Sequence, residues 1–347
     1  MTTAKPAIRL GFFTRLLDRV DAAERYRLAI AQIVHAESSG FDSAWVAQHH
    51  FHEDEGGLPA PFVFLAQVAA RTARIRLGTG IVTLPLELPI RVAEDAAVLD
   101  LMCGGRLEVG VGPGGNLSAY KAFDLDSAER TALLIRHHRV LLDAWAGRPL
   151  LGGDRLYPSN PGLVDRVWQA TFTVEGARRA GAAGDGLMLS RTQPRPAEAP
   201  HLSLPEIQHP MIDAYLDALP QGRTPRILAS RTVFVTDERA EALRLAEIGL
   251  ARQRARYAAI GRTGFVEGMS VHDQIAAMDI HVGNPADVIA SLRADTILAR
   301  ATDLTVQSNS IDPPHEFILR SIELVAGEVA PALGWVPSGE AATRRIA

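Results

Sequence analysis

Three histidines lie close together in the segment 48–55, directly after a short apolar run at 44–47. His49 and His50 are adjacent, and His52 precedes three acidic residues. Histidine titrates near neutral pH, so an imidazole here could give or take a proton in a reaction. Neighbouring strand residues point to opposite faces, so one of the pair should face inward. Two interpretations remain open beside catalysis: hydrogen-bonded structural histidines, and a divalent metal site, for which no second ligand set with suitable spacing is apparent.

A second candidate is the tripeptide Gly78-Thr79-Gly80, which interrupts an apolar stretch just before Ile81. Glycine inside a strand often marks a bulge, or a point where a ligand approaches the backbone closely. A flat aromatic cofactor would need such a patch without side chains, with Thr79, Gly80 and Ile81 beneath it. The alternative is that the glycines serve packing alone.

Two further segments could bind an anion. Gly112, Gly114 and Gly115 belong to a glycine-rich stretch that could present backbone N–H groups to it. Thr171 and Thr173 stand just before an expected helix start, where the free N–H groups favour negative charge. The competing interpretation is that one of these threonines simply caps the helix.

Ser190 and Arg191 follow another apolar stretch, and Arg191 could contact a phosphate or the edge of a flat cofactor. The alternative for Arg191 is an ordinary surface arginine. The sequence contains no Gly-x-Ser-x-Gly elbow and no Walker loop, so covalent hydrolase and nucleotide-triphosphatase chemistry are not supported. Cys103 is the only cysteine, which excludes an internal disulfide and fits a reducing compartment.

The elements that must position these residues alternate between strand-like and helix-like segments. Eight strand-like segments are 8–13, 43–47, 75–82, 107–111, 165–169, 187–190, 226–235 and 303–307. Segments of helical periodicity follow them, and this alternation predicts a (β/α)8 TIM barrel. Ligands then bind at the carboxyl ends of the strands, where the candidate residues stand. A doubly wound open sheet is the main competitor, but no Gly-x-Gly-x-x-Gly follows the first strand.

We expect one barrel domain over 1–335, with 192–223 and 262–283 as loop or lid insertions and 336–347 as a disordered tail. The 347 residues are 47% hydrophobic, as in a globular protein, and a net charge of -4 argues against nucleic-acid binding. No apolar run of 18 residues and no signal-peptide pattern is present. We therefore expect a cytoplasmic protein without membrane association.

Together these stretches resemble the bacterial luciferase-like family of flavin-dependent monooxygenases, and within it a subgroup of FMN-dependent enzymes. The matching residues are 40–51, 74–81, 89–95, 99–100 and 105–110, with 167–173 and 189–195 for the subgroup. The resemblance runs from the first strand to about Leu333. It implies a luciferase-like TIM barrel that binds reduced FMN (FMNH₂) from a separate flavin reductase. The reduced flavin would form a C4a-peroxide with O₂ and oxygenate a small organic substrate. Many relatives are dimers, which implies a homodimer.

The resemblance also implies roles for individual residues. His49 matches the family's catalytic histidine, and Gly80-Ile81 matches a non-prolyl cis peptide beneath the flavin ring. Pro113 stands where the luciferase α-subunit has an arginine for the flavin phosphate. The phosphate would then depend on the glycines at 114 and 115, Thr171, Thr173 and Arg191. Four aromatic residues near strand ends could line the closed pocket that the chemistry needs: Phe12, Phe13, Trp45 and Phe51.

Three other functions stay open on these residues. A deazaflavin (F420) dependent oxidoreductase on the same barrel would transfer hydride without O₂. A flavin-binding protein without turnover would bind flavin and consume no O₂. A metal-dependent barrel hydrolase would use His49, His50 and His52. The substrate is not readable from the sequence, and we expect the 192–223 segment to select it.

Overall fold

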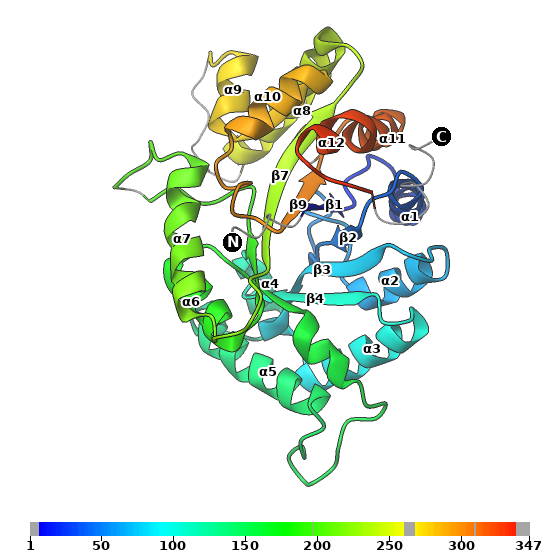
Figure 1. Cartoon of the computed structure of the whole chain (residues 1–347), viewed down its shortest axis with the longest axis vertical. Helices are drawn as coiled ribbons and strands as arrows, with labels where there is room; N and C mark the ends of the chain where they lie inside the picture. The colour runs from blue at the N-terminus through cyan, green and yellow to red at the C-terminus, as the bar shows by residue number, and fades with distance from the viewer. Residues whose placement is uncertain (1–6, 197, 260–267, 309, 338–347) are drawn as a thin grey trace, which may run out of the picture.

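A computed structural model describes residues 7–196, 198–259, 268–308 and 310–337. Eight parallel strands close into a ring with helices outside it (Figure 1). The ring strands are β1 (Arg9–Thr14), β2 (Ser43–Val46), β3 (Arg76–Thr83), β4 (Leu107–Gly112), β5 (Val167–Thr171), β6 (Gly186–Leu189), β7 (Ile227–Val235) and β9 (Asp303–Gln307). β6 pairs with β7, and β9 pairs with both β7 and β1, so the sheet has no open edge there. The predicted (β/α)8 barrel is confirmed, and the open sheet is excluded.

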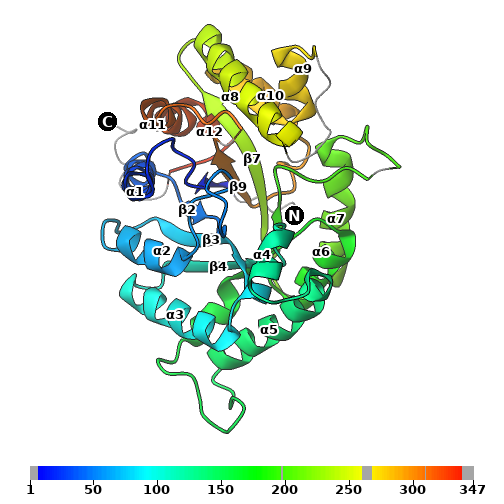
Figure 2. The same cartoon turned by 180° about the vertical axis from the view of Figure 1, so that it is seen from behind.

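Helices surround the ring in both views (Figures 1 and 2). The longer ones are α1 (Ala22–Ser38), α2 (Pro61–Ala69), α3 (Pro89–Met102), α5 (Arg130–Trp145), α6 (Val174–Ala183), α7 (Leu204–Ala218), α8 (Arg239–Ala259), α10 (Pro285–Ala294) and α11 (His315–Leu324). Three short helices are α4 (Leu117–Ala122), α9 (Val271–Ala277) and α12 (Ala330–Ala332). None of the helices in the described part of the chain is long and apolar enough to span a bilayer.

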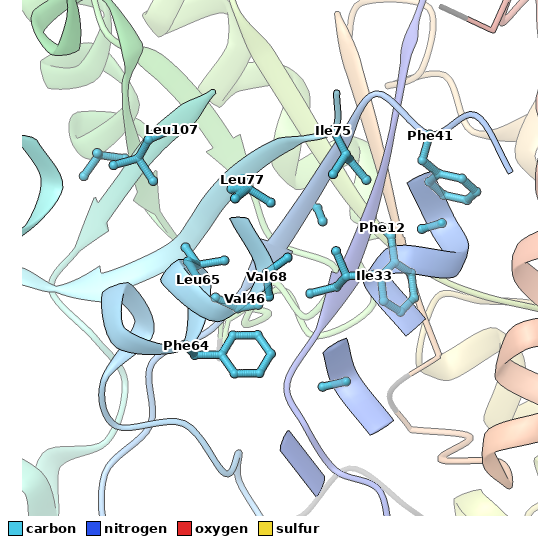
Figure 3. Packing of buried hydrophobic residues seen from close by; sticks show 14 of the residues in the cluster. Phe12, Ile33, Phe41, Val46, Phe64, Leu65, Val68, Ile75, Leu77 and Leu107 are labelled. Carbon is cyan, nitrogen blue, oxygen red and sulfur yellow. The ribbon is translucent and has the colours of Figure 1, made fainter. Parts of the chain in front are cut away.

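Two apolar layers hold the barrel together, because alternate strand residues point to opposite sides of the sheet. Phe12 faces outward into the layer beneath the helices, where residues such as Ile33 of α1 and Phe64 of α2 pack (Figure 3). Its neighbour Phe13 belongs to the cluster inside the ring, with Trp45, Trp168, Met188 and Leu228. The two indoles pack edge to face with centroids 5.7 Å apart. The ring is therefore filled by side chains, and a ligand has room only at its mouth.

A buried carboxylate ties the amino ends of β4 and β5 together. Asp100 at the end of α3 accepts two hydrogen bonds from the Arg166 guanidinium, at 2.6 and 2.7 Å. It also accepts one from Asn160 at 2.8 Å and one from the Leu107 N–H at 3.0 Å. Asp100, one of the residues that match the family, therefore stabilises the fold. It lies at the amino ends of the strands, opposite the rim where ligands bind in such barrels.

The two expected insertions both contain secondary structure. α7 lies within 192–223, and a capping box of Ser203 and Glu206 starts it. α9 and a ninth strand, β8 (Ile280–Gly283), lie within 262–283, and β8 pairs with the carboxyl half of β7 outside the ring. Whether either segment acts as a lid stays a prediction. Residues 262–267 of the second segment and 338–347 of the expected tail lie outside the described residues.

Candidate active site

The wall of the barrel is interrupted where β3 reaches the mouth. The Gly80-Ile81 peptide bond is cis, and the β3–β4 register shifts between Thr79 and Val82. The Thr79 hydroxyl bridges the gap, because it donates to the Gly110 carbonyl at 2.8 Å and accepts from the Gly110 N–H at 2.9 Å. The expected bulge and the expected cis peptide are both confirmed. Thr79 is fully buried, backbone included, whereas Gly80 and Ile81 are partly exposed.

A buried glutamine holds the bulge from the β2 side. The Gln48 amide oxygen accepts from the Thr83 N–H at 2.7 Å, and its backbone N–H donates to the Ile81 carbonyl at 3.2 Å. Its amide nitrogen donates to Glu87 at 2.7 Å, and burial raises the pKa of that carboxyl group. Sequence reasoning missed this role of Gln48, although its place between an apolar run and His49 was a signal.

The three clustered histidines lie in different surroundings. His49 is half-buried directly after β2, where its N–H donates to the Leu58 carbonyl at 2.9 Å. Its ring lies against Gly56, since a Cβ at that glycine would come within 2.5 Å of the imidazole Cδ2. His50 packs edge-on against Phe123, and burial lowers its pKa. His52 contacts the Ser118 hydroxyl at 3.0 Å. Among the described residues, no group of three or more His, Cys, Asp or Glu could hold a metal ion.

The glycine-rich loop after β4 lies beside the bulge. A Cβ at Gly112 would come within 2.9 Å of the Ile81 side chain, and one at Gly114 within 2.6 Å of the Thr83 methyl group. Gly114 also has a φ of 70°, a backbone conformation that disfavours other residues. Nothing lies within 4 Å of the Cβ position at Gly115, which faces open space. A ligand could therefore reach the backbone at 114–115 without meeting a side chain of those residues.

The candidate threonines lie at the start of α6. The Thr173 hydroxyl accepts from the Gly176 N–H at 3.0 Å and caps the helix, which confirms the capping interpretation for this residue. The Thr171 hydroxyl accepts from the Thr173 N–H at 3.1 Å. Ser190 lies on the adjacent loop, whose Gln193 donates to the Phe172 carbonyl at 2.7 Å. The loops after β5 and β6 thus meet at this helix start, and anion binding there stays a prediction.

Arg191 is not a surface residue, because only 7% of it is exposed. Its guanidinium lies 3.2 Å from the Thr232 hydroxyl on β7 and 3.2 Å from the Ser310 hydroxyl in the loop after β9. The interpretation as an ordinary surface arginine is therefore wrong. The contacts at β7 and β9 place the charged group on the part of the rim that carries those strands.

Comparison with known proteins identifies the family. A sequence model described as luciferase-like monooxygenase matches residues 9–301. The chain belongs to the luciferase-like monooxygenase family. A relative in this group, the 4-hydroxyprotoasukamycin monooxygenase of Streptomyces nodosus subsp. asukaensis, is 30% identical over 341 residues, which cover 89% of this chain and 90% of that protein.

Solved structures show that this luciferase-like barrel is shared widely. The oxygenating constituent of 3,6-diketocamphane monooxygenase from Pseudomonas putida, in complex with FMN, has a TM-score of 0.76 at 20% identity and covers 94% of this chain and 98% of its own. An F420-dependent secondary alcohol dehydrogenase, in complex with an F420-acetone adduct, has a TM-score of 0.66 at 18% identity, covering 94% and 99%. At these identities the two structures show a common fold.

The luciferase-like barrel has a cavity of about 290 Å³ between the loops after β1 and β9 and the helices α1, α8 and α11. Phe12 and Phe13 line it, and whether it is the pocket that the flavin chemistry needs stays a prediction. Phe13 also covers the inner side of the bulge, since its Cε2 lies 2.6 Å from the Cβ position of Gly80. The other two aromatic residues expected in the pocket lie elsewhere: Trp45 is buried inside the ring, and Phe51 is 67% exposed.

Proposed function

We propose that this luciferase-like monooxygenase uses reduced FMN, supplied by a separate flavin reductase. It would transfer one oxygen atom of O₂ to a small organic substrate, while the other atom leaves as water. The observation that carries the proposal is the bulge at Gly80-Ile81, flanked by the glycine-rich loop after β4. A flat ring needs such a stretch of bare backbone at the mouth of a barrel that is otherwise filled.

The residues at the mouth fit this cofactor. The partly exposed backbone of Gly80 and Ile81 would support the isoalloxazine ring, and Thr79 would hold that backbone from below through its bonds to Gly110. Side chains at Gly112 or Gly114 would collide with Ile81 or Thr83, so the loop after β4 can stay close to the bulge only as glycine.

The phosphate end would lie across the loops after β4, β5 and β6. Backbone N–H groups at 114–115 and the first turn of α6 would favour its negative charge. Thr171, Thr173 and Ser190 would supply hydroxyl groups there. We leave Arg191 out of this phosphate site, because its contacts lie at β7 and in the loop after β9.

Bound flavin supplies the redox chemistry, and the chain positions it and protects it from water. We propose that His49 holds or moves a proton during the reaction. Its ring lies against Gly56, and the Cβ position of Gly56 is 3.2 Å from the Arg15 carbonyl in the loop after β1. Residues 17–20 of the same loop line the cavity, and we propose that the substrate binds on this side of the imidazole.

Replacement of His49 tests its role. His49→Ala should retain FMNH₂ binding but lower product formation by about 10²–10⁴-fold, the range for loss of a general acid or base. His52→Ala is the matched control, because this histidine is exposed and contacts only a rim hydroxyl at Ser118. Unchanged turnover in His49→Ala, or equal losses in both variants, would rule out the proposed role.

An F420-dependent oxidoreductase is the second candidate, because the same barrel fold occurs in an F420-dependent enzyme. It would transfer hydride without O₂, so anaerobic turnover with reduced F420 and none with FMNH₂ would decide in its favour. A flavin-binding protein without turnover would instead bind FMNH₂ and yield no product with any candidate substrate.

A further inference from the structure

Four arginines converge on one carboxylate at the rim of the barrel. Burial raises the pKa of Asp312, and the positive charges of Arg15, Arg191, Arg252 and Arg19 oppose that rise. These residues come from the loops after β1, β6 and β9 and from helix α8. The structure thus gathers them from segments far apart in the sequence.

Close packing holds this arginine cluster in place. A Cβ at Gly249 of α8 would lie only 2.0 Å from the Ile311 carbonyl, so the helix and the loop after β9 touch backbone to backbone. Arg252, about one turn further along α8, donates to the Asp312 carbonyl at 3.4 Å. Arg191 contacts Ser310 in the same loop. The cluster is therefore part of the packed rim.

Among the described residues, guanidinium groups outnumber carboxylates here, because the four arginines around Asp312 are opposed by that carboxylate and by Asp18, which lines the adjoining cavity. The pKa of Arg252 is lowered, first by burial and then by repulsion from Arg19, while Asp312 opposes the shift. Such mutual repulsion is relieved when an anion enters.

The cavity beside the cluster has two unlike sides. Phe12, Phe13 and Leu17 are apolar, whereas the charged side holds Arg19 and Arg252 together with the carboxylates of Asp18 and Asp312. Its volume of about 290 Å³ suits a small molecule with an apolar body and an anionic end. Phe13 is the side chain that the cavity and the bulge share, since it also covers Gly80.

We propose that this cavity binds the substrate as a small organic acid, with its carboxylate at Arg19 and Arg252 and its apolar body toward Phe13. Arg15 and Arg191 add positive charge behind the site. Asp312 is the built-in counter-ion that an incoming carboxylate must compete with. Calling the ligand a substrate rests on the proposed function, whereas the binding site itself does not.

Binding of hexanoate to the full chain without flavin tests the site, with hexanamide as the uncharged match. Calorimetry should show hexanoate binding about tenfold more tightly, as expected for a hydrogen-bonded charge pair. Arg252→Gln should remove about tenfold of that affinity. The control Arg244→Gln, on the exposed side of the same helix and paired with Glu241, should change nothing.

Asp312→Asn gives a result of the opposite sign, which a merely damaged fold would not produce. Removing the counter-ion should tighten hexanoate binding several-fold and leave hexanamide binding unchanged. Equal binding of the two probes, no effect of Arg252→Gln, or weaker hexanoate binding in Asp312→Asn would overturn the inference. FMNH₂ binding, measured separately on the same preparations, tells its failure apart from failure of the proposed function.

Discussion

Gly110 on β4 shows how a single residue can determine the shape of the site. The Thr79 hydroxyl replaces a missing backbone pair at the bulge by bonding both polar groups of Gly110. A Cβ at Gly110 would lie 2.1 Å from the Thr79 carbonyl and 2.9 Å from the Met188 sulfur, both inside the filled ring. The bulge can therefore close onto β4 only if this residue has no side chain.

Gly110→Ala should lower the free energy of unfolding by about 1–3 kcal/mol, the usual cost of overpacking a core. It should also weaken FMNH₂ binding, because the bulge must move. Gly115→Ala is the control, since its Cβ position is open and its stability should stay within about 0.5 kcal/mol of the parent protein. Denaturant unfolding of both variants measures this, and equal stabilities would contradict the packing argument.

At the level of single residues, the sequence predicted the bulge at Gly80-Ile81 better than the contacts of the charged residues at the rim. Glycine inside an apolar strand indicates a bulge from the local sequence alone, so the irregularity at Gly80-Ile81 could be predicted. The direction of the Arg191 side chain depends on Thr232 and Ser310, which are remote in sequence. The charged surroundings of Asp312 could not be predicted either, because only the closed barrel brings the arginines near it.

At the scale of elements, β7 extends beyond the ring and pairs there with β8. His281 on β8 is buried, with its Nδ1 2.7 Å from the Ser291 hydroxyl of α10. Burial and the charge of Arg231 lower its pKa to about 4, while Asp295 acts in the other direction. The imidazole is thus kept neutral between two secondary-structure layers.

This histidine should make stability depend on pH. Its folded pKa of about 4 lies below the unfolded value of 6.5, so the unfolded chain binds the proton first as the pH falls. The contribution of neutral His281 to the free energy of unfolding is therefore complete above pH 6.5, and it falls by about 3 kcal/mol between pH 6.5 and pH 4. His281→Gln should flatten the unfolding free energy in that window, and identical pH profiles for both proteins would contradict the assignment.

Elements with strong apolar runs were predictable, and those defined by long-range pairing were not. Ring strands such as β2 and β6 are short apolar runs, whereas β8 depends on β7 for its hydrogen bonds. Pro210 would suggest a helix that begins near it, but α7 already starts at Leu204, because the capping box of Ser203 and Glu206 sets its start and Pro210 is accommodated inside the helix.

At the scale of the whole molecule, one outer face is unusually apolar. Val63 of α2, Leu88 before α3, and Leu101 and Met102 at its end are all more than half exposed. α2 and α3 are neighbours on the outside of the barrel (Figures 1 and 2). We propose that this face pairs two copies of the chain, as the family resemblance implies, since exposed apolar side chains on neighbouring helices favour an interaction site.

Charge on this face should separate the copies. The double variant Leu101→Glu with Met102→Glu should run as a monomer in light scattering, because burying two carboxylates in an interface is costly. Leu151→Glu, in an exposed loop, should leave the dimer intact. A monomeric parent protein, or a dimer that tolerates both carboxylates, would show that this face does not mediate assembly.

The central claim is that the mouth of the barrel binds reduced FMN on the backbone of the Gly80-Ile81 bulge. Anaerobic titration of the purified chain, first with FMNH₂ and then with reduced F420, tests it most directly. We predict saturable binding of one FMNH₂ per chain, with weaker binding in Gly110→Ala. Binding of F420 alone, or of neither cofactor, would contradict the account.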